Sequence, residues 1–194
     1  MSKTVAPPAT RGRILEAGFT LFGRYGFKRT SMEDIASEAG LSRAALYLQF
    51  RNKEDIFRGL AAGLHERCLK AAEDALSGGG TLTERLQAAV EGKTLPMIEI
   101  TNSSPHGSEL MDETNRLCGD LAAESGRRFQ KMLAEAFQRA DGTDVYLRSA
   151  RLTPAEAADL FAASIHGLKA LDVTPAAFRK RLARFVTVFV SGLR

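Results

Sequence analysis

Apolar residues recur along most of this chain at the three- and four-residue spacing of an amphipathic helix. The first such stretch, residues 11–25, carries one apolar stripe made of Ile14, Leu15, Gly18, Leu21, Phe22 and Tyr25. Comparable patterns cover about residues 30–39, 43–49, 52–76, 82–101, 108–118, 120–140 and 153–171, and one further stretch starts at residue 174. β-Branched residues are sparse beside Ala, Leu, Arg and Glu, so an all-α fold is predicted.

Residues that begin and end helices divide the first sixty positions into short pieces. Gly26 is expected to end the first helix, and Thr30-x-x-Glu33 is read as a capping box that starts the second. Gly40 permits the left-handed corner that ends this helix, and Ser42 can cap a very short third helix. Asn52 is expected to cap the fourth.

Similar signals mark the rest of the chain. Gly78-Gly79-Gly80 ends the fourth pattern, and Pro96 is expected to bend the fifth because it removes an internal hydrogen bond. Thr153-Pro-Ala-Glu156 is a second capping box with Pro at the first helical position. Thr174-Pro175 opens the last helix, which is expected to turn Phe178, Leu182, Phe185, Phe189 and Leu193 inward.

The corner at Gly40 joins two short helices in the layout of a helix-turn-helix, whose second helix enters the major groove of DNA. Leu46 is the expected buried anchor of that helix. Arg43 can form a bidentate hydrogen bond to guanine, while Ala44 and Ala45 allow close approach and methyl contact to thymine. The Tyr47 hydroxyl suits a phosphate oxygen, and Gln49 can reach a phosphate or adenine.

Three further residues are candidates for phosphate contact. Thr30 and Ser31 lie at a helix N-terminus, where free amides attract anions. Lys53 lies in the first turn of the next helix, where a nearby phosphate would offset an unfavourable cation. The residues proposed to contact DNA are Thr30, Ser31, Ser42, Arg43, Ala44, Ala45, Tyr47, Gln49 and Lys53. For single members the alternative is an ordinary solvated surface charge, as for Arg43 and Lys53, or packing, as for Tyr47.

The charge distribution agrees with this interpretation. The formal net charge is +4, and residues 1–60 hold ten Lys and Arg against six Asp and Glu. Residues 61–194 hold seventeen of each. The whole basic excess therefore lies on the segment with the motif, where phosphate contacts would use it.

Other classes of site have little support in the sequence. Cys68 and Cys118 are too few and too far apart for a zinc site or a disulfide framework, and each is expected to be a reduced core residue. The histidines, His65, His106 and His166, lack metal-ligand spacing, so no metal and no cofactor is assigned. No apolar run is long enough to cross a membrane, residues 1–10 read as a flexible arm without a secretory signal, and a cytoplasmic location is expected.

Residues 11–60 resemble the N-terminal domain of the tetracycline-repressor (TetR) family of bacterial transcription regulators. The resemblance rests on Ile14-Leu15-x-Ala17, Leu21-Phe22, Tyr25-Gly26-Phe27, Thr30-Ser-Met-x-x-Ile35-Ala36, Ala39-Gly40-Leu-Ser42, Leu46-Tyr47, Phe50 and Asn52-Lys53-Glu54. It implies an all-helical homodimer of about nine helices per subunit that binds a palindromic operator on double-stranded DNA, usually to repress. Ala45 and Leu48-Gln49 depart from the common family pattern, which leaves the operator sequence open.

These observations predict a DNA-binding helix-turn-helix domain over residues 11–57. Residues 58–194 are then expected to form a helical domain for ligand binding and dimerisation. The last two helices are apolar on more than one face, and two from each subunit would form a four-helix bundle across a two-fold axis. The residues expected at this interface are Ala158, Ala162, Ile165, His166, Ala170, Val186, Phe189 and Val190; packing within the subunit is the alternative.

The family usually binds a small inducer among its middle helices. The candidate residues for an apolar ligand are Met97, Ile100, Thr101, His106, Met111, Cys118, Phe129, Met132 and Phe137, with Leu117 and Leu133 beside them. A stripe of Met and Phe is more often part of an ordinary core than of a pocket, so packing in the core is the favoured alternative for each of these residues.

The function predicted from the sequence is a homodimeric, sequence-specific repressor that a small molecule releases from its operator. A nonspecific architectural DNA-binding protein is the first alternative. An enzyme is a more distant one, because no nucleophile–base pair, paired-carboxylate signature or phosphate loop is present.

Overall fold

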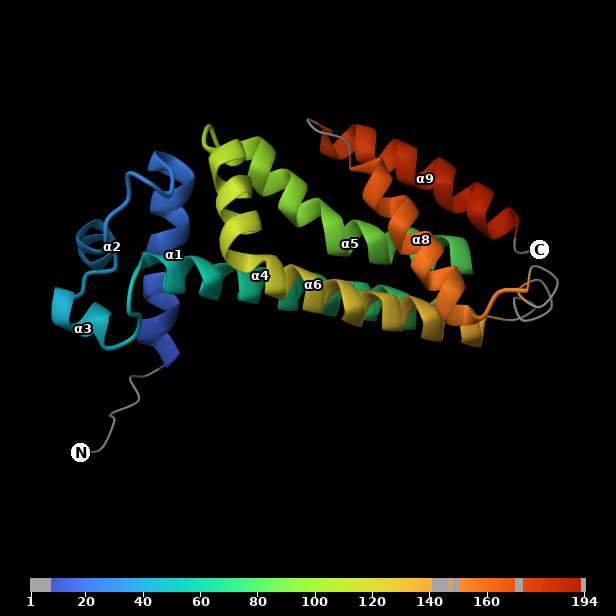
Figure 1. Cartoon of the computed structure of the whole chain (residues 1–194), viewed down its shortest axis with the longest axis horizontal. Coiled ribbons are helices and arrows are strands. Elements are labelled where there is room, and N and C mark those ends of the chain that lie inside the picture. Colours follow the sequence, from blue (N-terminus) through green and yellow to red (C-terminus); the bar gives the residue numbers. More distant parts are fainter. Residues whose placement is uncertain (1–7, 141–146, 148–150, 170–172, 193–194) are drawn as a thin grey trace. The chain divides into compact units, whose positions relative to one another are not determined.

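The computed structural model describes residues 8–140, 147, 151–169 and 173–192. These residues form eight helices and no strand, which confirms the all-α prediction (Figure 1). The helices are α1 (Pro8–Tyr25), α2 (Met32–Glu38), α3 (Arg43–Tyr47), α4 (Lys53–Ser77), α5 (Leu82–Ser103), α6 (Gly107–Arg139), α8 (Pro154–Leu168) and α9 (Pro175–Ser191). The helix α1 begins three residues before the predicted start, so the expected arm is at most residues 1–7, which lie outside the described part.

Most of the predicted helix ends are confirmed. Gly26 and Gly40 have φ of 84° and 62°, the left-handed conformation that glycine adopts without strain. The Ser42 side chain accepts a hydrogen bond from the Ala45 amide, and that of Asn52 accepts one from Asp55. At the start of α8, Thr153 and Glu156 form the predicted capping box.

The helix α6 joins two predicted helices. Cys118 interrupts it with φ −128° and ψ 17°, next to the predicted break at residue 119. The backbone is therefore kinked there although the helix continues. Counting the two parts separately gives nine helical segments among the described residues, the number that the resemblance implied.

The chain forms two compact units. The first contains residues 1–64 and 100–121, and the second contains residues 65–99 and 122–194. Residues 100–121, from the end of α5 and the start of α6, thus pack with the helix-turn-helix segment. This grouping links parts of the chain that the sequence analysis placed in separate domains.

The core of the first unit lies between α1 and the start of α4. Phe22, Phe27 and Phe57 stack against one another with ring centroids 5.3–5.6 Å apart. A Cβ atom on Gly18 would lie 2.8 Å from Cγ2 of Ile56, so α1 and α4 cross at a position that admits only glycine without a shift. Ile35, Leu46 and Cys118 are fully buried in the same core.

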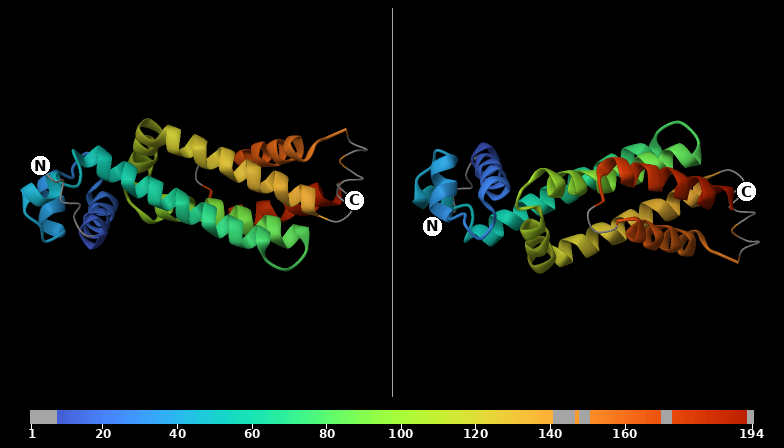
Figure 2. Two further views of the ribbon diagram at one scale, coloured as in Figure 1. Left: turned by 90° about the horizontal axis from the view of Figure 1, so that it is seen from below. Right: turned by 90° about the horizontal axis from the view of Figure 1, so that it is seen from above.

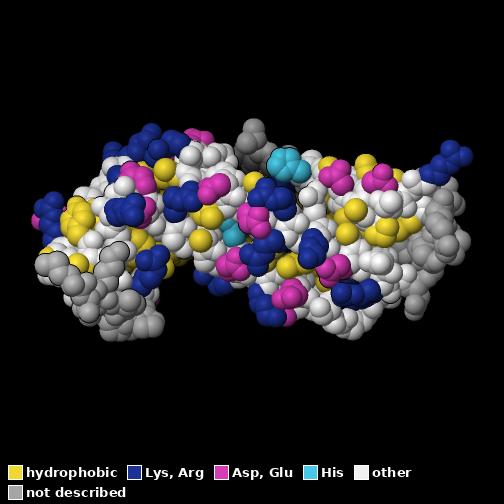
Figure 3. Space-filling model, turned by 60° about the horizontal axis from the view of Figure 1, so that its bottom comes forward, with side chains coloured by type: hydrophobic (Ala, Val, Ile, Leu, Met, Phe, Trp, Pro, Cys, Tyr) yellow, Lys and Arg dark blue, Asp and Glu magenta, His cyan; other side chains and the backbone are white. Residues whose placement is uncertain are grey.

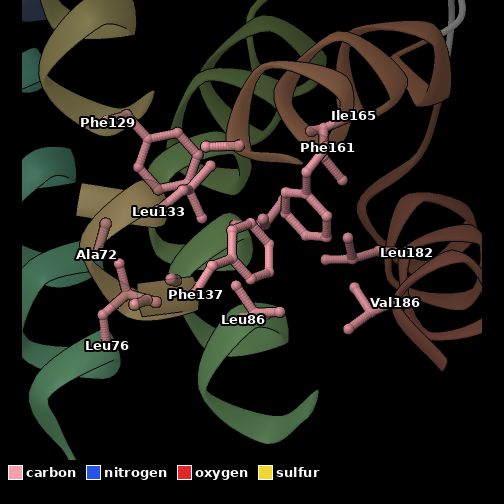
Figure 4. Packing of buried hydrophobic residues seen from close by; sticks show 14 of the residues in the cluster. Ala72, Leu76, Leu86, Phe129, Leu133, Phe137, Phe161, Ile165, Leu182 and Val186 are labelled. Atoms are coloured by element: carbon pink, nitrogen blue, oxygen red, sulfur yellow. The ribbon is translucent and has the colours of Figure 1, made fainter. Parts of the chain in front are cut away.

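The core of the second unit combines residues from α4, α5, α6, α8 and α9. Residues 65–77 of α4 and 122–139 of α6 run lengthwise beside each other (Figure 2). Phe137 and Phe161 face each other in the middle of this core with centroids 5.9 Å apart, and Leu182 and Val186 approach from α9 (Figure 4). Packing in this core determines which faces of α8 and α9 are buried.

The inward face of α9 is wider than the predicted row. Phe178, Leu182, Val186 and Val190 form the buried row, each four residues after the last. The predicted row continued through Phe185 and Phe189, which are only partly buried. Phe185 and Phe189 still pack against the core, because their ring centroids lie 5.3 and 5.0 Å from that of Phe161. Val186 and Val190 lie deeper in the same core, and Leu193 lies outside the described residues.

Candidate nucleic-acid interface

The helix α3 is a short platform with one buried side chain. Its N-cap is Ser42, and the fully buried Leu46 fixes it to the core of the first unit, as predicted. Five residues allow only one inward position. The remaining side chains of the helix therefore face outward or lie at its edge.

The outward face of α3 carries Arg43, Ala44 and Tyr47, with Leu48 directly after it. The side chain of Arg43 is 64% exposed and its guanidinium lies 5.7 Å from the centre of the Tyr47 ring. Its ion pair with Glu33, at 3.7 Å, is a weak one between exposed groups. Arg43 can therefore exchange Glu33 for a ligand at little cost. Leu48 is 82% exposed, which makes it the most exposed large apolar side chain in this unit.

Other predicted contacts of this helix are less open. Ala45 and Gln49 are half-buried, and the backbone carbonyl of Gln49 accepts a 3.5 Å hydrogen bond from Arg11. The Arg11 guanidinium also lies over the Phe50 ring at 4.3 Å. These contacts hold the end of α3 in place, and they leave Gln49 a smaller outward surface than Arg43 has.

The capping box of α2 lies one residue later than predicted. Ser31, not Thr30, is the N-cap, and it forms a capping box with Asp34 in place of Glu33. Thr30 is 3% exposed, and its hydroxyl donates to the Gly26 carbonyl at 2.8 Å. Thr30 therefore closes the turn before α2 and has little surface to offer a phosphate, whereas Ser31 is exposed.

Lys53 was expected to meet a phosphate, but its ammonium is occupied within the chain. It donates to the carbonyls of Phe27, Lys28 and Thr30 at 2.9, 3.2 and 3.1 Å. It also lies 4.5 Å from the centre of the Phe27 ring. Because an ammonium has three protons to donate, these three carbonyls use its full capacity. Lys53 holds the α1–α2 turn against the start of α4.

Arg13 has a matching role at the corner between α2 and α3. Its guanidinium donates to the carbonyls of Ala39 and Gly40. Part of the basic excess in this segment thus orients the helix-turn-helix. Exposed basic side chains that the sequence analysis did not single out remain at Lys28, Arg29 and Arg51. Their position in turns beside α2 and α4, rather than any helical pattern, makes them candidates for phosphate contact.

Residues 104–109 pack directly on the turn between α1 and α2. The Ser104 hydroxyl donates to the Gly23 carbonyl at 2.8 Å, and the Lys28 amide donates to the Glu109 carboxylate at 2.8 Å. The Nδ1 atom of His106 lies 3.6 Å from the same carboxylate. A movement of this segment would therefore change its contacts with α1 and with the turn that leads to α2.

The candidate ligand residues fall in both units. Ile100, Thr101, His106 and Met111 are half-buried parts of the first unit, where Cys118 is fully buried. In the second unit, Phe129 and Phe137 belong to the buried core, Met132 packs against it and Met97 is half-buried. For Cys118, Phe129 and Phe137 the structure gives a core role.

The candidate interface residues also divide. Ala158, Ile165, Val186 and Val190 are buried within the subunit, so they cannot also form an outer surface. Ala162 and Phe189 are partly buried, His166 is exposed, and Ala170 lies outside the described residues. The exposed large apolar side chains of this pair of helices are Leu160 (50%) and Val188 (72%), which lie beside the predicted rows.

The face shown in Figure 3 mixes Lys and Arg with Asp and Glu, and small apolar patches lie between them. No helix among the described residues is long and apolar enough to cross a membrane.

The segment with the helix-turn-helix is similar to known proteins. Residues 14–60 match the family model described as "Bacterial regulatory proteins, tetR family". The chain is 37% identical over 87 residues to an uncharacterized HTH-type transcriptional regulator, YfiR, of Bacillus subtilis. It is 42% identical over 57 residues to the HTH-type transcriptional regulator TtgR of Pseudomonas putida. These matches cover 42% and 29% of this chain, and 42% and 27% of the relatives' own lengths.

Solved structures extend the likeness in fold. A fatty acid degradation regulator, FadR, from Bacillus halodurans has a TM-score of 0.66 at 16% identity, and the match covers 93% of this chain and 96% of that one. A SmeT–triclosan complex has a TM-score of 0.62 at 19% identity, with coverage of 94% and 90%. At these identities the likeness shows the fold of the whole chain.

Proposed function

We propose that the chain is a homodimeric transcriptional repressor of the tetR family of bacterial regulatory proteins, whose model residues 14–60 match. It binds a palindromic operator and leaves it when a small molecule binds. The observation that carries this proposal is the exposed face of α3, where Arg43 and Tyr47 point outward while Leu46 is fully buried. Acting on DNA, the protein belongs in the cytoplasm.

In this proposal α3 lies in the major groove with its N-terminal end toward the bases. Arg43 reads guanine, Ala44 and Ala45 allow the close approach, and Tyr47 and Gln49 contact the backbone or a base edge. Ser31, Ser42, Lys28 and Arg29 contact phosphates. Thr30 and Lys53 act indirectly, because their polar groups already hold the α1–α2 turn.

A homodimer would place two such helices about 34–36 Å apart, one turn of B-DNA. The exposed apolar side chains Leu160 on α8 and Val188 on α9 support an interface on these helices. Ala163, Ser164 and Gly167, which are small and exposed, follow Leu160 at helical spacing and would permit close approach of a second copy.

Release by a small molecule requires a link between the ligand and α3. Residues 100–121 provide a candidate link, since they share a compact unit with the motif and contact Gly23 and Lys28. A ligand preferring a different position of this segment would shift the population away from the DNA-binding form; a preference of about 100-fold corresponds to roughly 2.7 kcal/mol. The solved SmeT–triclosan complex shows that one protein of this fold takes such a ligand.

The proposal is tested by fluorescence anisotropy with the DNA upstream of the gene and a random duplex at one salt concentration. Specific binding at least 1,000-fold tighter than random binding is expected, as for typical operators. Equal affinity for both duplexes would favour the architectural alternative. The wild-type protein and an Arg43→Ala variant are measured in parallel, so that the difference between their affinities shows whether α3 is responsible for specific binding.

A further inference from the structure

The second unit contains a group of polar side chains that the DNA-binding function does not use. His65 lies on α4, Lys93 on α5, Ser125 on α6, and Lys169 directly after α8. The Nε2 atom of His65 and the Oγ atom of Ser125 are buried and have no hydrogen-bond partner among the described residues. Buried polar atoms without partners are costly and uncommon, so each such atom points to a missing partner.

Contacts of neighbouring residues bring α4, α5 and α6 together near this group. The two oxygens of Glu66, next to His65, pair with the guanidinium of Arg128, which lies one turn after Ser125. On α5, a Cβ on Gly92 would lie 3.0 Å from Cβ of Ala71, so α4 and α5 are in close contact beside Lys93. Burial and then the charge of Lys93 lower the pKa of His65, and the same charge acts on Lys169 and on Cys68.

The two ammonium groups of this set have no ion-pair partner in the part of the chain that the structure describes. Neither Lys93 nor Lys169 forms an ion pair within the described ranges, whereas the neighbouring acids are engaged: Glu66 with Arg128, and Glu91 and Glu99 with Arg179. Desolvation lowers the pKa of Lys93 and of Lys169, although the side chain of Lys169 is accessible.

Apolar residues lie beside each member of this group. One turn away on the same helical faces are Leu69, Ala89, Phe129 and Ile165, all buried in the core of the second unit. Each member of the group therefore lies one turn from a residue of the apolar core of the second unit.

We propose that His65, Lys93, Ser125 and Lys169 bind the anionic head group of an amphipathic small molecule whose apolar part lies against the core of the second unit. The imidazole and hydroxyl supply hydrogen bonds, and the two ammonium groups supply the charge. This inference rests on the proposed function in one respect only: the ligand bound here would be the effector that releases DNA.

A pair of dyes with the same aromatic frame tests the proposal on the full-length protein. The anionic dye 1-anilinonaphthalene-8-sulfonate and the neutral N-phenyl-1-naphthylamine are titrated by fluorescence. Lys93→Gln is expected to weaken binding of the anionic dye about tenfold, the size of one charge-assisted hydrogen bond, and to leave the neutral dye within about twofold. Lys93→Arg, which keeps the charge, should restore most of the affinity, and Lys131→Gln, an exposed lysine of α6, should change neither.

Displacement of the anionic dye identifies the head group. Decanoate and decyl phosphate represent a carboxylate and a phosphate, and 1-decanol is the neutral control. Displacement by either anion at concentrations where 1-decanol has no effect supports the proposal and names the head group. Equal displacement by 1-decanol, or an anionic-dye affinity unchanged in Lys93→Gln, would overturn it.

Two controls separate this inference from the proposed function. Circular dichroism melting of each variant reports folding, and Lys169→Gln gives a second charge removal at an accessible position. Operator binding is measured without dye in parallel. If dye selectivity is absent while specific operator binding persists, the anion site alone is wrong; if dye selectivity is present but specific operator binding is absent, the proposed function alone is wrong.

Discussion

Basic side chains of the first sixty residues divide into two kinds with different tasks. Arg11, Arg13 and Lys53 donate to backbone carbonyls within the chain. Arg43 and Arg29 are exposed and free to meet a ligand. The excess of charge that pointed to DNA in the sequence is therefore partly structural, and substitutions of the two kinds should have different consequences.

Replacing Arg43 by Ala should weaken operator binding by about 10- to 100-fold, the range of about 1–3 kcal/mol for one bidentate base contact. Binding to random DNA should fall far less, because the loss is one of base reading. Competition binding at fixed salt measures both affinities. Arg127→Ala, at an exposed position of α6, serves as the matched control, and an equal loss on both duplexes would contradict the assigned role.

Replacing Lys53 by Met should act on stability. Three carbonyls lose their donor, so the free energy of unfolding should fall by about 1–3 kcal/mol in urea titrations. Arg29→Met should leave stability nearly unchanged and reduce the slope of log affinity against log salt by about one. A salt slope that falls for Lys53→Met while its stability is retained would show that Lys53 meets a phosphate after all.

Local signals were enough to predict most helix ends, and they failed where two patterns competed. Thr30-x-x-Glu33 and Ser31-x-x-Asp34 both fit a capping box, and only the burial of Thr30 between α1 and α2 decides between them. On α9 two apolar rows are present: Val186 and Val190 are buried, while Phe185 and Phe189 are partly buried and stack on Phe161. Such choices depend on partners far away in the sequence.

Among the helices of the first unit, Arg58 of α4 and Asp120 of α6 form a bidentate pair at 2.7–2.8 Å. Hydrogen bonding to Arg58 lowers the pKa of Asp120 to about 2 from an ordinary value of 3.8. Because the folded-state pKa is depressed, the pair stabilises the fold fully above the ordinary value. The contribution disappears as the pH falls through about 2.

The corresponding experiment compares melting temperatures of the wild type and Asp120→Asn between pH 6 and pH 2. The wild type should melt higher at pH 6, and the two curves should converge as the pH approaches 2. A difference that is constant across this range would show that the carboxylate charge contributes nothing to the contact.

The segment that joins α5 to α6 is expected to affect DNA binding from a distance. Glu109→Gln removes the charge that meets the Lys28 amide and His106, and Ser104→Ala removes the donor to Gly23. Either change should alter operator affinity several-fold, within the range of about 0.5–2 kcal/mol for coupled positions. Ser108→Ala, at an exposed neighbour, is the control. Anisotropy values identical to wild type would exclude this segment as the link.

Considered as a full chain, the protein has two compact units whose boundary does not follow the sequence. The sequence analysis located the helix-turn-helix and its caps but not the return of residues 100–121 to that unit, because no local signal announces it. Nor did it find His65, Lys93, Ser125 and Lys169, since these residues are scattered over four segments and share only their position in space.

Subunit pairing is expected to depend on the exposed apolar side chains of α8 and α9. Leu160→Lys combined with Val188→Lys introduces two charges at that surface and should convert the dimer to monomers in sedimentation velocity. The affinity for the operator should also fall, because a monomer can contact only one of the two half-sites. Ala123→Lys, at an exposed position of α6, should remain dimeric. Monomers in the wild type at micromolar concentration would refute the proposed pairing.

The central claim, that paired α3 helices read DNA sequence, is tested most directly by selecting binding sites from a random duplex library with the purified protein. The account predicts enrichment of a palindrome whose half-sites are about one helical turn apart, with a position that loses its preference for guanine in the Arg43→Ala protein. A library that emerges without a shared sequence, or the same enriched sequence from wild type and Arg43→Ala, would contradict it.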